Sequence, residues 1–136
     1  MATASREHMR VLAAEFAQAV PANHALALYG DLGVGKTTFV QGLARFWGIT
    51  QPVTSPTFNL LAIYHGARTL LHLDAYRLRH PDEIDGLMLE DFLDPPYCLA
   101  IEWPEHLGNR LPQPSWRLDF AIRGKRHEVR WQESLF

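Results

Sequence analysis

One segment limits the possible folds of this chain more than any other, the glycine-rich run from Gly30 to Thr37, Gly-Asp-Leu-Gly-Val-Gly-Lys-Thr. It matches the phosphate-loop pattern G-x-x-x-x-G-K-[ST] at every position and lies between a predicted strand and a predicted helix. Glycines let backbone amides approach a phosphate closely, and the positive end of the following helix adds to the attraction. Lys36 offers a cation for the β- and γ-phosphates, and Thr37 offers a hydroxyl for Mg²⁺. The segment therefore predicts a nucleoside triphosphate site.

The spacing of apolar residues on either side predicts alternating helices and strands. We expect helices over 5–20, 36–47 and 81–92, and strands over 24–29, 60–64, 69–73, 97–101, 116–122 and 127–131. Short polar segments at 65–68 and 123–126 indicate two hairpins, and the prolines and threonines of 49–58 indicate irregular structure. These elements predict an α/β fold, a P-loop NTPase-like three-layer sandwich with a mixed parallel and antiparallel sheet, in one domain spanning 1–136.

Two carboxylates follow apolar runs downstream of the loop. Asp74 comes after Leu70–Leu73, and Glu102 comes after Cys98–Ile101. Ligands of open α/β sheets bind beyond the carboxyl ends of the strands, where one carboxylate holds Mg²⁺ and another group orients water. For each carboxylate, the alternative interpretation is a solvated acidic side chain at the end of a strand, without a role in binding. The segment Thr54–Thr57 occupies the position at which several phosphate-loop proteins place a segment that senses the γ-phosphate. The alternative interpretation of this segment is an ordinary proline turn.

Composition narrows the classes of function. Thirteen basic and fifteen acidic side chains give a formal charge of −2, without the basic excess of a general polyanion-binding protein. Cys98 is the only cysteine, which excludes an intramolecular disulfide and a cysteine zinc cluster, and the seven histidines show no metal-ligand spacing. No apolar run reaches the roughly 18 residues that span a bilayer, and the first residues lack a signal-peptide pattern, so we expect a cytoplasmic protein without membrane contact.

Four segments occur together in a characteristic order: Gly30–Thr38, Ser55–Phe58 (Ser-Pro-Thr-Phe), His72–Leu78 (His-Leu-Asp-Ala-Tyr-Arg-Leu) and Ile101–Glu105 (Ile-Glu-Trp-Pro-Glu). Over nearly the whole chain they resemble the bacterial TsaE family, small P-loop ATPases required to make N6-threonylcarbamoyladenosine at position 37 of tRNA. The resemblance implies an ATP- and Mg²⁺-dependent ATPase of tRNA processing. It also implies that the partners are the TsaD and TsaB proteins, which form a heterodimer, and that ATP hydrolysis resets the assembly. Contact with tRNA would then be indirect, through this complex.

The resemblance also implies roles for single residues. Lys36, Asp74 and Glu102 would be catalytic, with Asp74 supporting metal or water, and Thr37 and Glu102 would be the Mg²⁺ ligands. The nucleotide would be held by the phosphate loop and by two residues beside the adenine: Asp31, Leu32, Gly33, Val34, Gly35, Lys36, Thr37, Thr38, Ser5 and Arg126. Lys125 and Arg123 are the alternatives to Arg126 in the last hairpin.

Other functions use the same loop. A small-molecule or nucleotide kinase usually carries a lid with arginines, for which the roughly ten residues between Phe92 and Glu102 leave little room. A GTPase would need an Asn-Lys-x-Asp segment, which does not occur here. A nucleotide-dependent adaptor with marginal hydrolysis stays open. An independent RNA contact would depend on a local patch of basic residues, namely Arg117, Arg123, Lys125, Arg126 and Arg130.

Overall fold

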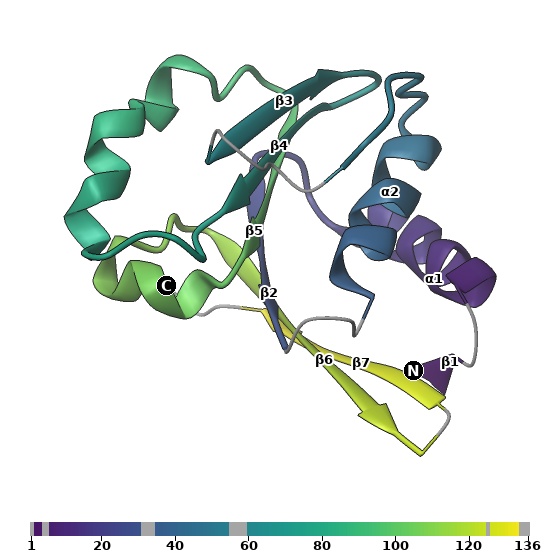
Figure 1. Ribbon diagram of the computed structural model, residues 1–136. Coiled ribbons are helices and arrows are strands. Elements are labelled where there is room, and N and C mark those ends of the chain that lie inside the picture. The colour runs from purple at the N-terminus through teal and green to yellow at the C-terminus, as the bar shows by residue number, and fades with distance from the viewer. Residues whose placement is uncertain (1, 4–5, 31–34, 55–59, 125, 134–136) are drawn as a thin grey trace.

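A seven-stranded mixed sheet forms the centre of the protein (Figure 1). The computed structural model describes residues 2–3, 6–30, 35–54, 60–124 and 126–133. The sheet order is β1-β7-β6-β2-β5-β4-β3. The strands are β1 (Ala2–Thr3), β2 (His24–Tyr29), β3 (Leu61–His65), β4 (Thr69–Asp74), β5 (Tyr97–Glu102), β6 (Ser115–Arg123) and β7 (Arg126–Glu133). Strands β6, β2, β5 and β4 run parallel, whereas β3 and β7 are antiparallel hairpin partners, so the predicted mixed sheet is confirmed.

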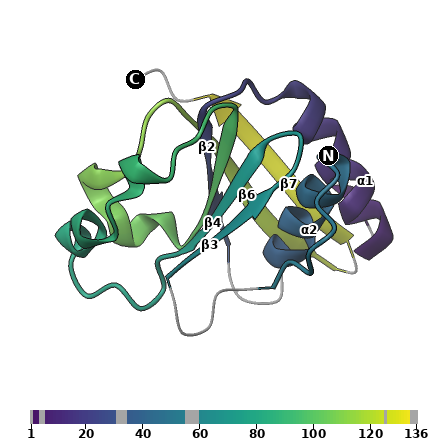
Figure 2. The same cartoon turned by 90° about the horizontal axis from the view of Figure 1, so that it is seen from above.

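Different helical segments cover the two faces of the sheet, which gives the expected three layers (Figure 2). Helices α1 (Arg6–Ala19) and α2 (Lys36–Phe46) pack on one face, over a core that includes Phe16, Phe39 and Leu28. Three 3₁₀ segments, η1 (Pro81–Leu87), η2 (Leu89–Asp91) and η3 (Pro104–Arg110), lie on the other face over a second core. Within the described ranges, no helix has the length and apolarity needed to cross a bilayer.

The layer formed by the 3₁₀ segments differs from the helix that the sequence predicts over 81–92. In place of one helix over 81–92 there are two 3₁₀ segments, interrupted at Met88 by a left-handed backbone with φ 52°. Asp85 and Gly86 are weak α-helix formers, and a helix that depends on tertiary packing readily tightens into 3₁₀ turns. Segment η3 and the two-residue strand β1 were not predicted. Both are short, and both depend on contacts with distant parts of the chain.

The parallel register brings the carboxyl ends of three strands together. Asp74 of β4 lies directly opposite Glu102 of β5, and Glu102 in turn lies opposite Leu28 of β2. Side chains alternate between the faces of a strand, so His72 and Asp74 share one face of β4. Their neighbour Leu70 belongs to the core beneath α1 and α2, which identifies that face as the one covered by α2. The strand ends are therefore directed at the start of this helix.

Helices α1 and α2 approach each other very closely at Gly42. A Cβ atom at this position would lie 2.6 Å from the Cβ of Ala13 and 3.1 Å from the backbone of Arg10. Real Cβ atoms essentially never approach another atom within 3.0 Å. Gly42 is thus required by helix packing, and this contact keeps α1 against the helix that begins at the phosphate loop.

We expect Gly42→Ala to lower the free energy of unfolding by about 1–3 kcal/mol, the usual cost of overpacking a tight contact. The gain in helix propensity, about 1 kcal/mol at most, opposes this loss but is smaller. Urea denaturation followed by circular dichroism measures the change. Gly86→Ala is the matched control, because a Cβ there meets nothing within 4 Å, and its effect should be near zero or slightly stabilising. Equal effects of the two substitutions would contradict the packing argument.

Candidate functional site

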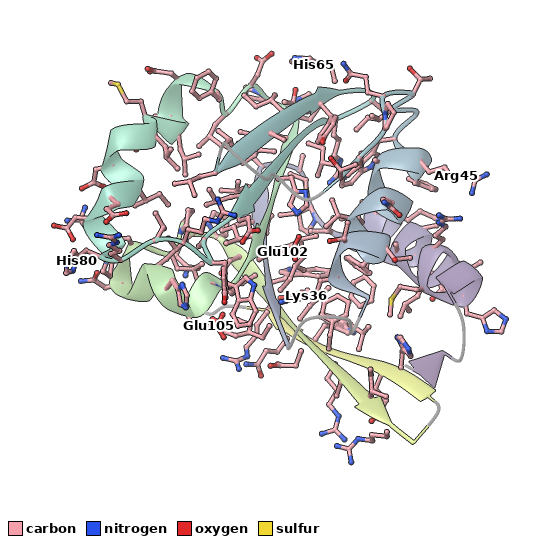
Figure 3. All side chains as sticks on the ribbon, in the orientation of Figure 1. Lys36, Arg45, His65, His80, Glu102 and Glu105 are labelled. Atoms are coloured by element: carbon pink, nitrogen blue, oxygen red, sulfur yellow. The ribbon has the colours of Figure 1, made fainter. Side chains whose placement is uncertain are left out.

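The first turn of α2 presents a buried lysine at the end of the phosphate loop. Gly35 precedes the helix with φ 95°, a left-handed conformation that glycine adopts without steric cost. Lys36 begins the helix and is only 4% exposed. Its Nζ donates a hydrogen bond of 2.6 Å to the carbonyl oxygen of Gly30 and lies 4.3 Å from the centre of the Trp103 ring. The ammonium group is thereby held between Gly30 and Trp103, near Glu102 (Figure 3).

Glu102 lies buried at the end of β5, 5% exposed, and faces the same helix turn. Its Oε2 accepts a hydrogen bond of 3.4 Å from Oγ1 of Thr37 and a shorter one of 2.6 Å from Nε2 of His72. The two residues expected to share a Mg²⁺ ion are therefore adjacent, although they lie far apart in the sequence. A hydroxyl and a carboxylate are hard oxygen ligands, the kind that Mg²⁺ takes together with phosphate oxygens and water. The donor set fits this ion.

The environment of Glu102 favours its ionised form. Burial raises the pKa of this carboxyl, but the hydrogen bond and charge of His72, the charge of Lys36 and the hydrogen bond of Thr37 together outweigh burial. The net result is a pKa lowered from the ordinary value of 4.5. Glu102 is consequently a carboxylate at neutral pH, as a metal ligand must be.

Asp74 occupies the neighbouring strand end but makes a different contact. It lies opposite Glu102 in the sheet, and its Oδ1 accepts a hydrogen bond of 3.0 Å from the backbone N–H of Tyr76. This contact stabilises the turn that follows β4, and the side chain stays partly exposed. The structure thus places both carboxylates at one edge of the sheet, where Glu102 contacts Thr37. The predicted role of Asp74 in supporting metal or water stays a prediction.

An aromatic cluster, which comprises Tyr76, Trp103 and His106, borders the site. The Trp103 ring centre lies 5.1 Å from that of Tyr76 and 6.0 Å from that of His106. Trp103 is partly buried, packs against the second core, and has a left-handed backbone with φ 59°, which is uncommon for a bulky residue. Tyr76 is 54% exposed. The Trp103 ring also receives the ammonium of Lys36 over its face.

His72, one of the seven histidines that show no metal-ligand spacing, is a residue of this site that the sequence patterns did not predict. It is fully buried in β4 and contacts Glu102. The available signal was its spacing of two residues from Asp74, which places both on one face of a strand. That signal becomes specific only once the register of β4 against β5 is known.

Several predicted nucleotide-binding residues cannot be placed. Ser5, Asp31, Leu32, Gly33 and Val34 lie outside the described residues, as does the Ser55–Phe58 segment. For Arg126 the structure describes the backbone, at the start of β7. Thr38 lies in the first turn of α2, partly buried. Over the ranges that the structure describes, no group of three or more His, Cys, Asp or Glu side chains could hold a metal ion on its own.

Fold and site together define a P-loop type of α/β protein. A family model described as "Threonylcarbamoyl adenosine biosynthesis protein TsaE" matches residues 3–131 of the chain. The chain therefore belongs to the TsaE family.

Relatives and a solved structure agree with this assignment. Three proteins named tRNA threonylcarbamoyladenosine biosynthesis protein TsaE are 42% identical over 88 residues (Treponema pallidum), 41% over 112 (Rickettsia bellii) and 36% over 122 (Bacillus subtilis). These matches cover 65%, 81% and 89% of this chain and 65%, 77% and 75% of the relatives, so the chain spans just under two thirds of the Treponema protein. The crystal structure of Bacillus subtilis YdiB superposes with a TM-score of 0.74 at 30% identity, over 95% of this chain and 80% of that one.

The lowered pKa of Glu102 predicts a pH dependence of stability. A carboxyl with a lower pKa in the folded state binds fewer protons there, so ionised Glu102 stabilises the fold above its unfolded value of 4.5. This contribution is lost as pH falls through the folded pKa. We expect the difference in unfolding free energy between wild type and Glu102→Gln to be constant above about pH 6 and to shrink below pH 4.5.

Denaturant titrations at a series of pH values measure this difference. Glu105→Gln is the control, because this carboxylate is exposed. A difference between wild type and Glu102→Gln that stays constant from pH 7 to pH 3 would show that the surroundings of Glu102 do not favour its ionised form.

Proposed function

We propose that this chain is a single ATPase domain that binds ATP with Mg²⁺ at the start of α2 and hydrolyses it in tRNA threonylcarbamoyladenosine biosynthesis, together with the TsaD–TsaB heterodimer in the cytoplasm. The observation that carries the proposal is the arrangement of the buried residues Lys36 and Glu102 with the partly buried Thr37, with 3.4 Å between Thr37 Oγ1 and Glu102 Oε2. The family assignment and the names of the relatives support the biological process.

Lys36 is prepared for a phosphate by the groups that hold it. Its ammonium contacts the Gly30 carbonyl and the face of Trp103, and it lies within the field of the Glu102 carboxylate. A phosphate oxygen carries a negative charge that the Gly30 carbonyl lacks, so the β- and γ-phosphates can compete for Nζ. Lys36 would therefore bind and orient the phosphates and stabilise the negative charge that develops during transfer.

Thr37 and Glu102 would hold the metal. Glu102 is already ionised, and its position beside the first turn of α2 brings a carboxylate to the place where phosphates bind a helix N-terminus. When bound, Mg²⁺ would neutralise charge shared by the β- and γ-phosphates. Asp74, at the adjacent strand end, would accept a hydrogen bond from water in or near this shell.

The aromatic cluster supports a role for partners. Trp103 contacts both Lys36 and the exposed Tyr76 ring. A movement of Lys36 on nucleotide binding would therefore shift Trp103 and, through it, the exposed ring of Tyr76. A partner that recognises one arrangement of this cluster must, by linkage, also favour the nucleotide that produces it.

Removing the Lys36 ammonium tests the site. We expect Lys36→Ala to lower the rate of ATP hydrolysis by about 100-fold or more, because a preorganised charge at the phosphates is lost. Release of inorganic phosphate, measured with and without TsaD and TsaB, gives the rate. Lys36→Met should lose as much activity while keeping an aliphatic stem against Trp103, which separates loss of charge from loss of packing.

Arg45→Ala is the matched control, since Arg45 is an exposed cation in the last turn of the same helix. It should hydrolyse ATP at the wild-type rate. Unchanged hydrolysis by a folded Lys36→Ala protein would remove this loop from the mechanism. Transfer of phosphate to an added small molecule in place of water would identify a kinase.

Binding to the heterodimer tests the role in the assembly. We expect affinity for TsaD–TsaB to be about 10-fold higher with a non-hydrolysable ATP analogue than with ADP, a typical coupling between two sites. Isothermal titration calorimetry measures both states. Trp103→Ala should reduce this difference, whereas Phe46→Ala, an exposed aromatic residue at the other end of α2, should leave it unchanged. Equal affinities in the two states would contradict nucleotide-controlled docking.

A further inference from the structure

Of the two described residues that donate a hydrogen bond to the carboxylate of Glu102, His72 makes the shorter one. The Nε2–Oε2 distance is 2.6 Å, whereas the distance from Thr37 Oγ1 to the same oxygen is 3.4 Å, near the limit for a hydrogen bond. Both donors bind Oε2, and Oε1 takes part in neither contact. The direction of the carboxylate is therefore set mainly by His72.

The other nitrogen of His72 makes no hydrogen bond within the part of the chain that the structure describes. Nδ1 is buried and has no partner among the described residues. The side chain itself is 0% exposed, beneath α2 and within a strand of apolar residues. Burying an unpaired polar nitrogen costs free energy, so a leucine would fill this place at lower cost. A merely structural role does not account for a histidine here.

We propose that His72 is a positioning residue that holds Glu102 in the orientation required to bind a divalent cation beside Thr37. A long side chain such as glutamate loses rotamer freedom when it is held, and a preformed orientation removes that cost from metal binding. Partners of metal ligands commonly contribute 10–100-fold to metal affinity through such contacts. This inference rests on the proposed ATP and Mg²⁺ site, and it adds the residue that preorganises the site.

Two amide substitutions separate positioning from packing. In His72→Gln an N–H donor can reach approximately the place of Nε2, whereas in His72→Asn the amide lies closer to the place of Nδ1, too far from Oε2. Both bury one neutral amide. His65→Asn is the matched control, because His65 is exposed at the far end of β3 (Figure 3).

Binding of Mn²⁺, a spectroscopic substitute for Mg²⁺, is measured by electron paramagnetic resonance in the presence of ADP. We expect His72→Asn to weaken Mn²⁺ binding about 10–100-fold, and His72→Gln to restore it to within about three-fold of wild type. In His72→Asn, the Mg²⁺ concentration for half-maximal hydrolysis should rise by a similar factor, whereas kcat at saturating Mg²⁺ should change far less. Wild-type affinity in folded His72→Asn, or equal losses in the two folded variants, would overturn the proposal.

Nuclear magnetic resonance of the metal-free wild-type protein adds a test that requires neither folding of a variant nor nucleotide. We expect the His72 ring to carry its proton on Nε2, the nitrogen that faces Glu102. An unprotonated Nε2 would overturn the proposal. A wild-type protein that binds no divalent cation with nucleotide would instead contradict the proposed function, so the two failures are distinguishable.

Discussion

The parallel pairing of β2, β5 and β4 is the constraint on which the site depends. It brings Glu102 opposite both Leu28 and Asp74, and Leu28 lies two residues before the loop that leads into α2. Because side chains alternate along a strand, a shift of the register by one residue would turn Glu102 away from α2 and into the core beneath the 3₁₀ segments. The chemistry of the site is therefore a consequence of pairings made by the apolar residues of three strands.

Much of this arrangement can be predicted from local patterns. The phosphate loop carries its own strand and helix, and an acidic residue at the end of an apolar run marks the carboxyl end of a strand. The rule that parallel strands bring these ends to one edge then groups Lys36, Asp74 and Glu102. The rule does not distinguish the two carboxylates. Asp74 accepts a hydrogen bond from a backbone N–H of the turn that follows β4, whereas Glu102 faces Thr37. This difference depends on the path of the backbone after each of the two strands.

The features that escaped prediction arise from contacts between distant segments. His72 lies within a strand that the apolar pattern predicts as buried, and only the neighbouring strand supplies the carboxylate that explains it. The contact between Lys36 and Trp103 depends on a left-handed residue after β5, a conformation that an aromatic residue seldom adopts. The 3₁₀ segments likewise reflect packing on the sheet more than the propensity of their residues.

The close contact between α1 and α2 also has a consequence for how chains of this kind can vary. At the crossing of Gly42 and Ala13 there is room for about one methyl group, and Ala13 supplies it. An alanine at position 42 becomes tolerable when position 13 changes to glycine, which leaves only the 3.1 Å approach to the backbone of Arg10 for the helices to accommodate. The two positions should therefore covary among related sequences, as a pair that shares one small volume, independently of any pressure from the nucleotide site.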